Sequence, residues 1–199
     1  MKKIRKKKEK DEQAEHEIVT DGPYQIERSD DATQVSIDIR DLPPPGRSYF
    51  ANSATIRREG GDVVFVFAQK IPLTDKASTL LAISYSADHF QEMLERIREF
   101  ATNVGNFVEE TGYKAGQSVD FEGLDRHLPD KVHTERASFE RMSFRATDAE
   151  IEFYALSPSG FREAMDLEKF DRLVVPQVAV TLSTALLNEL LRTAFELSE

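Results

Sequence analysis

The chain has 199 residues, a net charge of −10 and 40% hydrophobic residues, a balance typical of a globular protein with a sizeable core. It contains no cysteine, which excludes disulfides, thiol catalysis and metal sites with cysteine ligands. Its longest apolar runs, such as residues 63–68, are far shorter than the roughly 20 residues that a membrane-spanning helix needs.

The first 22 residues are expected to form a disordered, charged tail. Residues 1–20 contain seven Lys or Arg, five Asp or Glu and no aromatic residue. Because no apolar stretch follows the lysines, we expect no secretory signal and assign the chain to the cytoplasm. The remaining residues carry 19 basic and 31 acidic side chains, a net charge of −12. Such a body favours basic partners, and only residues 2–10 could attract nucleic acid.

The next segments predict a group of strands followed by a long helix. Residues 32–42 alternate between apolar and polar side chains, which indicates a half-buried strand. Residues 49–58 and 62–69 predict a hairpin around two glycines, and residues 78–85 predict another strand. Ser86 is the expected N-cap of a helix that runs from residue 87 to about residue 111.

A connector at residues 113–132 leads to a second group of elements. Residues 139–145 and 150–156 predict a hairpin, and residues 173–182 predict the last strand. Ser183 is the expected N-cap of the final helix. The segment 157–170 is about ten residues longer than its counterpart in the first group, and it is expected to include a short helix.

The second group repeats the order of the first. Leu81, Ile83 and Tyr85 correspond to Val178, Val180 and Leu182, while Val64 and Val66 are aligned with Ile151 and Phe153. The expected fold is therefore α+β, with two tandem antiparallel β-β-β-α units packed as a pseudo-dimer. The first unit spans residues 23–112, including an extra N-terminal strand, and the second spans residues 133–199.

The two units differ on one strand. In the second unit, Glu150 and Glu152 alternate with apolar residues, whereas the aligned positions of the first unit are also apolar. These apolar side chains are either core residues, covered by residues 35–39 or by the connector, or an exposed patch for a partner or a second subunit. The apolar side chains of the long first helix either pack against the helix of the second unit or form a contact between chains. The candidate partner-binding residues are Val63, Phe65, Phe67, Phe100, Val104 and Phe107.

No motif singles out a metal, a cofactor or a reaction. His127, Asp130 and His133 have a spacing that ligands could have, but Pro129 interrupts any helix there and no further ligands follow. The sequence has neither a glycine-rich phosphate loop nor a nucleophile elbow. No catalytic, metal or cofactor residues are therefore assigned, and a non-enzymatic function is expected. An enzyme site in segment 157–170 or 113–133 remains an alternative.

The stretch 48–111 resembles a family of short, uncharacterised bacterial proteins. The shared pattern is the entry Tyr49-Phe50-Ala51-Asn52, an alternating strand around Ile56, a strand over residues 64–69 that ends near Gln69, and a further strand followed by Ser86 and an amphipathic helix. The second unit lacks the aromatic-Ala-Asn entry, which makes it a diverged duplicate. This resemblance implies a type of domain but no activity.

The order of strands followed by a long helix, in an acidic protein, is also similar to that of the export chaperone SecB. This resemblance implies apolar grooves beside the sheet that bind unfolded, often basic segments, with Phe65 and Phe67 as the first contacts. The expected function is a protein-binding module, either chaperone-like or an assembly subunit of an oligomer. The alternative is a nucleic-acid accessory protein that acts through the basic N-terminal tail.

Overall fold

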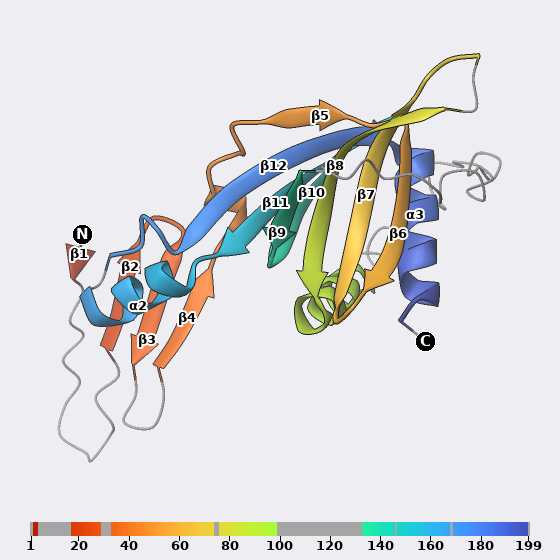
Figure 1. Cartoon of the computed structure of the whole chain (residues 1–199). Helices are drawn as coiled ribbons and strands as arrows, with labels where there is room; N and C mark the ends of the chain where they lie inside the picture. Colours follow the sequence, from red (N-terminus) through yellow and green to blue (C-terminus); the bar gives the residue numbers. More distant parts are fainter. Residues whose placement is uncertain are drawn as a thin grey trace. The chain divides into compact units, whose positions relative to one another are not determined.

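The computed structural model describes residues 2–3, 17–28, 33–73, 76–98, 133–145, 147–167 and 169–198. These residues form an α+β structure with three four-stranded sheets (Figure 1). The chain divides into two compact units, a small one and a large one. The small unit consists of Met1–Pro44 and Leu156–Val175, and the large unit consists of Pro45–Ala155 and Pro176–Glu199. These units do not follow the divisions expected at residues 22, 112 and 132.

The small unit contains one sheet and one helix. Its strands lie in the order β1 (Lys2–Lys3), β2 (Glu17–Asp21), β3 (Tyr24–Arg28) and β4 (Thr33–Ile37). Helix α2 (Pro158–Leu167) belongs to the same unit, and Arg28 donates a hydrogen bond of 2.8 Å to the carbonyl of Met165 in this helix. The short helix expected in the 157–170 segment is therefore present.

One expectation for the N-terminal region is wrong, and a second is confirmed only in part. Residues 17–21 are not part of a disordered tail, because β2 pairs with β3 along its whole length and Val19 is buried. The strand expected over 32–42 ends at Ile37, where the Asp38 carboxylate accepts a hydrogen bond from the Arg40 N–H and caps the 3-10 turn η1 (Ile39–Asp41). A capped turn cannot continue the ladder of the strand.

The large unit contains two sheets of the same topology. One has the order β6 (Ser53–Glu59), β7 (Asp62–Lys70), β8 (Ala77–Ser86) and β9 (Thr134–Ala137). The other has the order β10 (Phe139–Phe144), β11 (Asp148–Leu156), β12 (Val174–Ser183) and β5 (Ser48–Phe50). We call them the β7 sheet and the β11 sheet. Helical residues 87–98 follow β8, and α3 (Thr184–Glu196) follows β12.

Each sheet obtains its last strand from the other half of the large unit. We define the first half as residues 48–98 and the second half as residues 134–155 with 176–196. Strand β5 of the first half pairs in parallel with β12, and β9 of the second half pairs in parallel with β8. The hairpins β6–β7 and β10–β11 stay within their own halves. The exchange of edge strands is therefore reciprocal.

The chain changes from one sheet to the other at two equivalent places. The N–H of Ala51 bonds to Thr181 in the β11 sheet, and the N–H of the next residue, Asn52, bonds to Ala68 in the β7 sheet. The Asn52 side-chain amide donates to the Lys70 carbonyl at 3.2 Å and accepts from the Lys70 N–H at 2.5 Å. In the second half, the N–H of Ser138 bonds to Tyr154, which places Ala137–Ser138 in the role of Ala51–Asn52.

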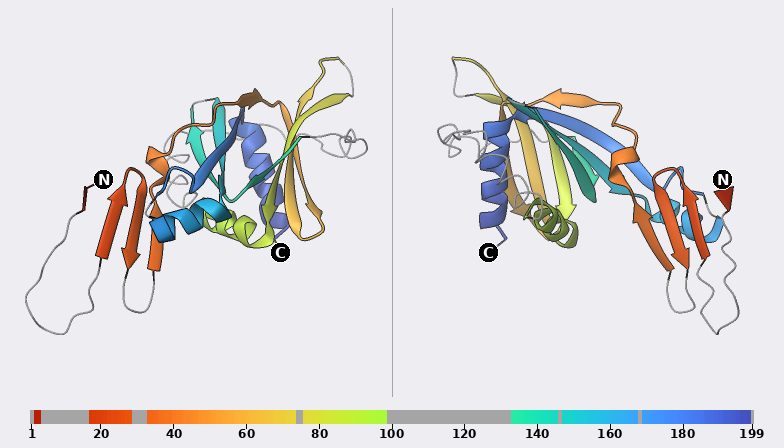
Figure 2. Two further views of the ribbon diagram at one scale, coloured as in Figure 1. Left: turned by 60° about the vertical axis from the view of Figure 1, so that its left-hand side comes forward. Right: turned by 180° about the vertical axis from the view of Figure 1, so that it is seen from behind.

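One hydrophobic core joins both sheets and both helices of the large unit. Phe67 of β7 lies 5.8 Å from Phe153 of β11, and Tyr85 of β8 lies 6.3 Å from the same ring. Helix α3 packs against β6, the edge strand of the sheet that belongs to the other half (Figure 2). The two halves thus share their apolar interior rather than folding around separate cores.

Candidate functional site

The structure places three of the six candidate partner-binding residues in the core. Val63, Phe65 and Phe67 are 4%, 3% and 0% exposed. The Phe65 ring packs against Tyr85 at 5.7 Å and against Phe90 at 6.2 Å, so helical residues 87–98 and the β11 sheet cover this face. The interpretation of these side chains as an exposed patch is therefore wrong. Phe100, Val104 and Phe107 lie outside the described residues.

The alignment of the two halves on this strand was shifted by one residue. Strands β7 and β11 each have nine residues and begin with an aspartate, so Phe65 corresponds to Ile151 and Phe67 to Phe153. All four side chains belong to the shared core. The shift arose because β7 is apolar on both faces, and a strand without alternation does not reveal which residues point inward.

With this corrected alignment, the positions of Glu150 and Glu152 correspond to the face of β7 that points away from the shared core. Val64 and Val66 are the counterparts of Glu150 and Glu152, and with Ala82 of β8 they form a separate apolar cluster. We call Val64, Val66 and Ala82 the Val64 face. Each of the three residues is at most 4% exposed. Strand β7 is thus buried on both faces, which agrees with the core alternative and not with the exposed patch.

Polar side chains border the Val64 face. Val64 lies opposite Arg57 on one neighbouring strand and Ser84 on the other. The Ser84 hydroxyl donates to the Asp62 carboxylate at 2.9 Å, and Arg136 forms an ion pair with the same carboxylate at 3.8 Å. Arg57 pairs with Glu59 through its terminal nitrogen, while its Nε is buried without a hydrogen-bond partner among the described residues. The apolar cluster therefore has a charged margin.

The matching face of the β11 sheet is polar and internally satisfied. Arg141 forms an ion pair with Glu152, and the Tyr154 hydroxyl donates to the same carboxylate at 3.3 Å. The Phe139 and Tyr154 rings stack at 5.5 Å. Burial and the nearby Glu152 charge raise the pKa of Tyr154 to about 12, so its hydroxyl stays protonated as a donor. Among the described residues of the large unit, the second face of the β7 sheet has a purely aliphatic cluster, whereas that of the β11 sheet combines charged and aromatic side chains.

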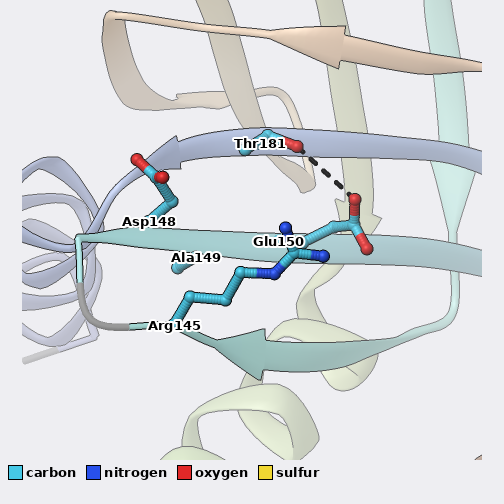
Figure 3. A pocket seen from close by; sticks show the side chains of 5 residues that line it. All are labelled: Arg145, Asp148, Ala149, Glu150 and Thr181. Carbon is cyan, nitrogen blue, oxygen red and sulfur yellow. Dashed lines mark hydrogen bonds between the residues drawn. The ribbon is translucent and has the colours of Figure 1, made fainter.

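Figure 3 shows a small pocket beside Glu150 in the β11 sheet. Its lining residues are Arg145, Asp148, Ala149, Glu150 and Thr181. The Thr181 hydroxyl donates to Glu150 at 3.4 Å, and the cavity has a volume of about 50 Å³. A cavity needs roughly 10–15 Å³ of such volume to hold one water molecule, and ligand pockets have roughly 300–1,000 Å³, so this space suits a few water molecules.

A second polar group lies inside the large unit. Glu140 of β10 is 6% exposed and accepts hydrogen bonds from Arg96 at 3.0 Å and from the Tyr85 hydroxyl at 3.3 Å. We call these three residues the Glu140 cluster. Burial raises the pKa of Glu140 and outweighs the opposing effect of the Arg96 charge. Burial, followed by the Glu140 charge, also raises the pKa of Tyr85.

The remaining candidates of the sequence have structural roles where they are described. His133 lies 2.6 Å from Glu135, which also pairs with Arg47. His127 and Asp130 lie outside the described residues, and within the described ranges no three His, Asp or Glu residues are grouped to hold a metal. Ser86 caps helical residues 87–98 by accepting from the His89 N–H, as predicted.

Comparison of the chain with protein-family models, with curated proteins and with solved structures finds no match. In the part of the chain that the structure describes, no helix has the length and apolar character needed to cross a membrane. The backbone of Lys2 and Lys3 pairs with β2, and the other basic residues of the tail lie outside the described residues. The faces of the two sheets are therefore the features of the chain that bear on its function.

Proposed function

We propose that the chain is a cytoplasmic, non-catalytic protein-binding module, either chaperone-like or an assembly subunit. Its large unit is an internal pseudo-dimer of two tandem β-β-β-α units, with a layout of the SecB kind. The equal topology of the two sheets and the reciprocal exchange of β5 and β9 support the tandem origin. The N-cap serines Ser86 and Ser183, at matching positions, support it independently.

The observation that carries the binding function is the Val64 face. One apolar face of β7 is sufficient to close the shared core, and β11 does so with Glu150 and Glu152 on its other face. The β7 sheet instead retains valines and an alanine there, beyond what its own core needs. Because these side chains are at most 4% exposed, a partner reaches them only after a rearrangement of this chain that exposes them.

The partner's chemistry follows from the surroundings of this face. The chain beyond residue 20 carries a net charge of −12, which attracts basic polypeptides over the distances that screening allows. An apolar surface with a charged margin suits a segment that combines apolar side chains with lysines or arginines. Unfolded basic polypeptides have this composition, and they expose it only before they fold.

The direct test is a binding titration with a reduced, carboxamidomethylated basic protein as the unfolded probe and the native form of that protein as the control. Fluorescence anisotropy would report binding of the unfolded form alone. The variant Val64→Thr with Val66→Thr keeps the shape of the face but makes it polar, and it should weaken binding about tenfold or more. The control variant Ile83→Val alters the core face of β8 and should leave binding unchanged.

Affinity purification with mass spectrometry then separates the two forms of the proposal. Recovery of many unfolded or nascent chains, reduced in the valine variant, supports the chaperone-like form. Recovery of one stoichiometric partner that the valine variant loses supports an assembly subunit. Equal recovery by the unmodified chain and the valine variant, together with no binding of the unfolded probe, overturns the proposal.

A further inference from the structure

The Glu140 cluster connects the two halves of the large unit. Tyr85 and Arg96 come from the first half, and Glu140 comes from β10 in the second half. Arg96 donates to both carboxylate oxygens of Glu140, at 3.2 Å and 3.0 Å. The carboxylate side chain is 4% exposed, whereas the arginine side chain is 37% exposed. The cluster is thus a mostly buried ionic contact between the halves.

The reciprocal contact on the other side of the pseudo-dimer has no such cluster. The cap residues Ser86 and Ser183 align the helices, so Tyr85 corresponds to Leu182 and Arg96 to Thr193. Glu140 of β10 pairs with Phe153 of β11, and Ala54 of β6 pairs with Phe67 of β7. Because Phe67 corresponds to Phe153, Ala54 is the counterpart of Glu140. Ala54 and Leu182 are buried parts of the shared core. The same contact is therefore ionic on one side and apolar on the other.

Backbone pairing alone does not distinguish the two halves. Tyr49 of β5 lies opposite Val180, and Glu135 of β9 lies opposite Ile83, which is the counterpart of Val180. Either edge strand therefore matches the register of either sheet. The same hydrogen bonds would also join two copies of this chain, first half to first half and second half to second half.

We propose that the Glu140 cluster selects the pairing of a first half with a second half and rejects the pairing of identical halves from two copies of this chain. This inference rests on the tandem architecture of the proposed function. Joining two first halves places Tyr85 and Arg96 beside Ala54, which leaves a cation without a carboxylate. Joining two second halves buries Glu140 beside Leu182 and Thr193 without a cation. Each incorrect pairing contains an uncompensated charge, and only the mixed pairing satisfies both groups.

The selection role can be separated from a simple contribution to stability. The variant Tyr85→Phe with Arg96→Met and Glu140→Leu replaces the cluster by apolar side chains of similar size. Such replacements often leave stability unchanged or raise it, so the variant is expected to fold. Its halves, however, no longer contain a charge that rejects identical halves. The single variant Arg96→Met leaves Glu140 without its cation and should lower the urea midpoint by about 1 M.

The experiment refolds each full-length variant from urea over a range of protein concentrations and measures its mass by light scattering. The unmodified chain should give one mass throughout. The triple variant should give an added species of twice that mass, and its share should rise with concentration during refolding. The control Arg141→Met with Glu152→Leu removes an ion pair that lies within the second half, and it should leave the mass unchanged.

A triple variant that keeps the mass of the unmodified chain at every concentration overturns the selection role. Doubling of the mass in the control as well also overturns it, because any lost ion pair would then promote assembly. Neither measurement involves an unfolded probe or the Val64 face. Failure of this inference is therefore distinguishable from failure of the proposed binding function.

Discussion

Arg96 Nη2 and Glu140 Oε2 lie 3.0 Å apart, although the arginine belongs to the first half of the large unit and the glutamate to the second. A carboxylate that is 4% exposed depends on such a partner, because an unpaired charge in the core is costly. The Arg96 side chain is 37% exposed, so water partly solvates the guanidinium group of the ion pair. These two exposures determine how the pair responds to substitution.

We expect Arg96→Met to lower the free energy of unfolding by about 2 kcal/mol, below the 3–5 kcal/mol of a fully buried pair, because water reaches the arginine side. Urea denaturation followed by circular dichroism measures this difference. The matched control is Arg192→Met, which removes exposed contacts with Glu189 and Glu196 within α3 and should change stability by less than about 1 kcal/mol. Equal effects of the two variants would contradict the assignment of Glu140 as a buried partner.

The raised pKa of Glu140 predicts a specific pH dependence. Burial is the largest cause, and it favours the neutral form of the folded-state carboxyl group. A group with a raised folded-state pKa contributes stability that is complete below its unfolded-state value and is lost as pH rises through the folded-state value. The variant Glu140→Gln lacks this titration. Relative to the unmodified chain, Glu140→Gln should therefore gain stability as the pH rises above the ordinary value of 4.5.

Paired urea titrations of the unmodified chain and Glu140→Gln at pH 4 and pH 7 measure this change. The comparison cancels all other titrating groups, provided that they respond equally in both proteins. A difference in unfolding free energy that stays constant between the two pH values, or that moves against the glutamine variant at higher pH, would contradict the raised pKa.

Phe65 and Phe67 provide a test of the correction made on β7. Both rings belong to the shared core, so the variant Phe65→Glu with Phe67→Glu should unfold the large unit rather than only weaken an association. The loss of two buried rings and the burial of two charges exceed the 5–15 kcal/mol that a domain of ordinary stability has available. Circular dichroism and amide dispersion in NMR spectra measure the outcome. A folded double variant would restore the interpretation of an exposed patch.

The sequence was most informative where a cap or a strong alternation fixed the phase. Ser183 accepts from the Leu186 N–H at the start of α3, as predicted. Val178, Val180 and Leu182, which the sequence aligned with Leu81, Ile83 and Tyr85, all belong to the shared core, as do the three residues aligned with them. Strand β7 lacks alternation, so its inward face was assigned one residue out of phase. One available signal was missed at Gly22-Pro23. These two residues form the turn between the paired residues Asp21 of β2 and Tyr24 of β3, and Gly22 has a φ of +56°.

The exchange of edge strands could not be predicted from local pattern. Residues 49–58 look like one strand because their side chains suit extended backbone, yet the chain changes sheets at Ala51–Asn52. The partners that define this change are Thr181 and Ala68, which are distant in sequence. The sequence entry Tyr49-Phe50-Ala51-Asn52 drew attention to Asn52 without giving its role. In the structure, the role is to bond the backbone of Lys70 where the new strand begins.

The Asn52 amide therefore predicts a measurable and asymmetric effect. Asn52→Ala removes both hydrogen bonds to Lys70 and should lower the free energy of unfolding by about 1–2 kcal/mol. Asn52→Asp keeps an acceptor for the Lys70 N–H but places a second acceptor against the Lys70 carbonyl, so it should restore only part of the loss. Ser143→Ala, at an exposed position of β10, is the control for a serine or amide side chain lost from the surface. Urea midpoints in the order Ser143→Ala, Asn52→Asp, Asn52→Ala support a crossover fixed by the amide. If Asn52→Ala is as stable as Ser143→Ala, the parallel pairing of β5 with β12 alone directs the chain from one sheet to the other.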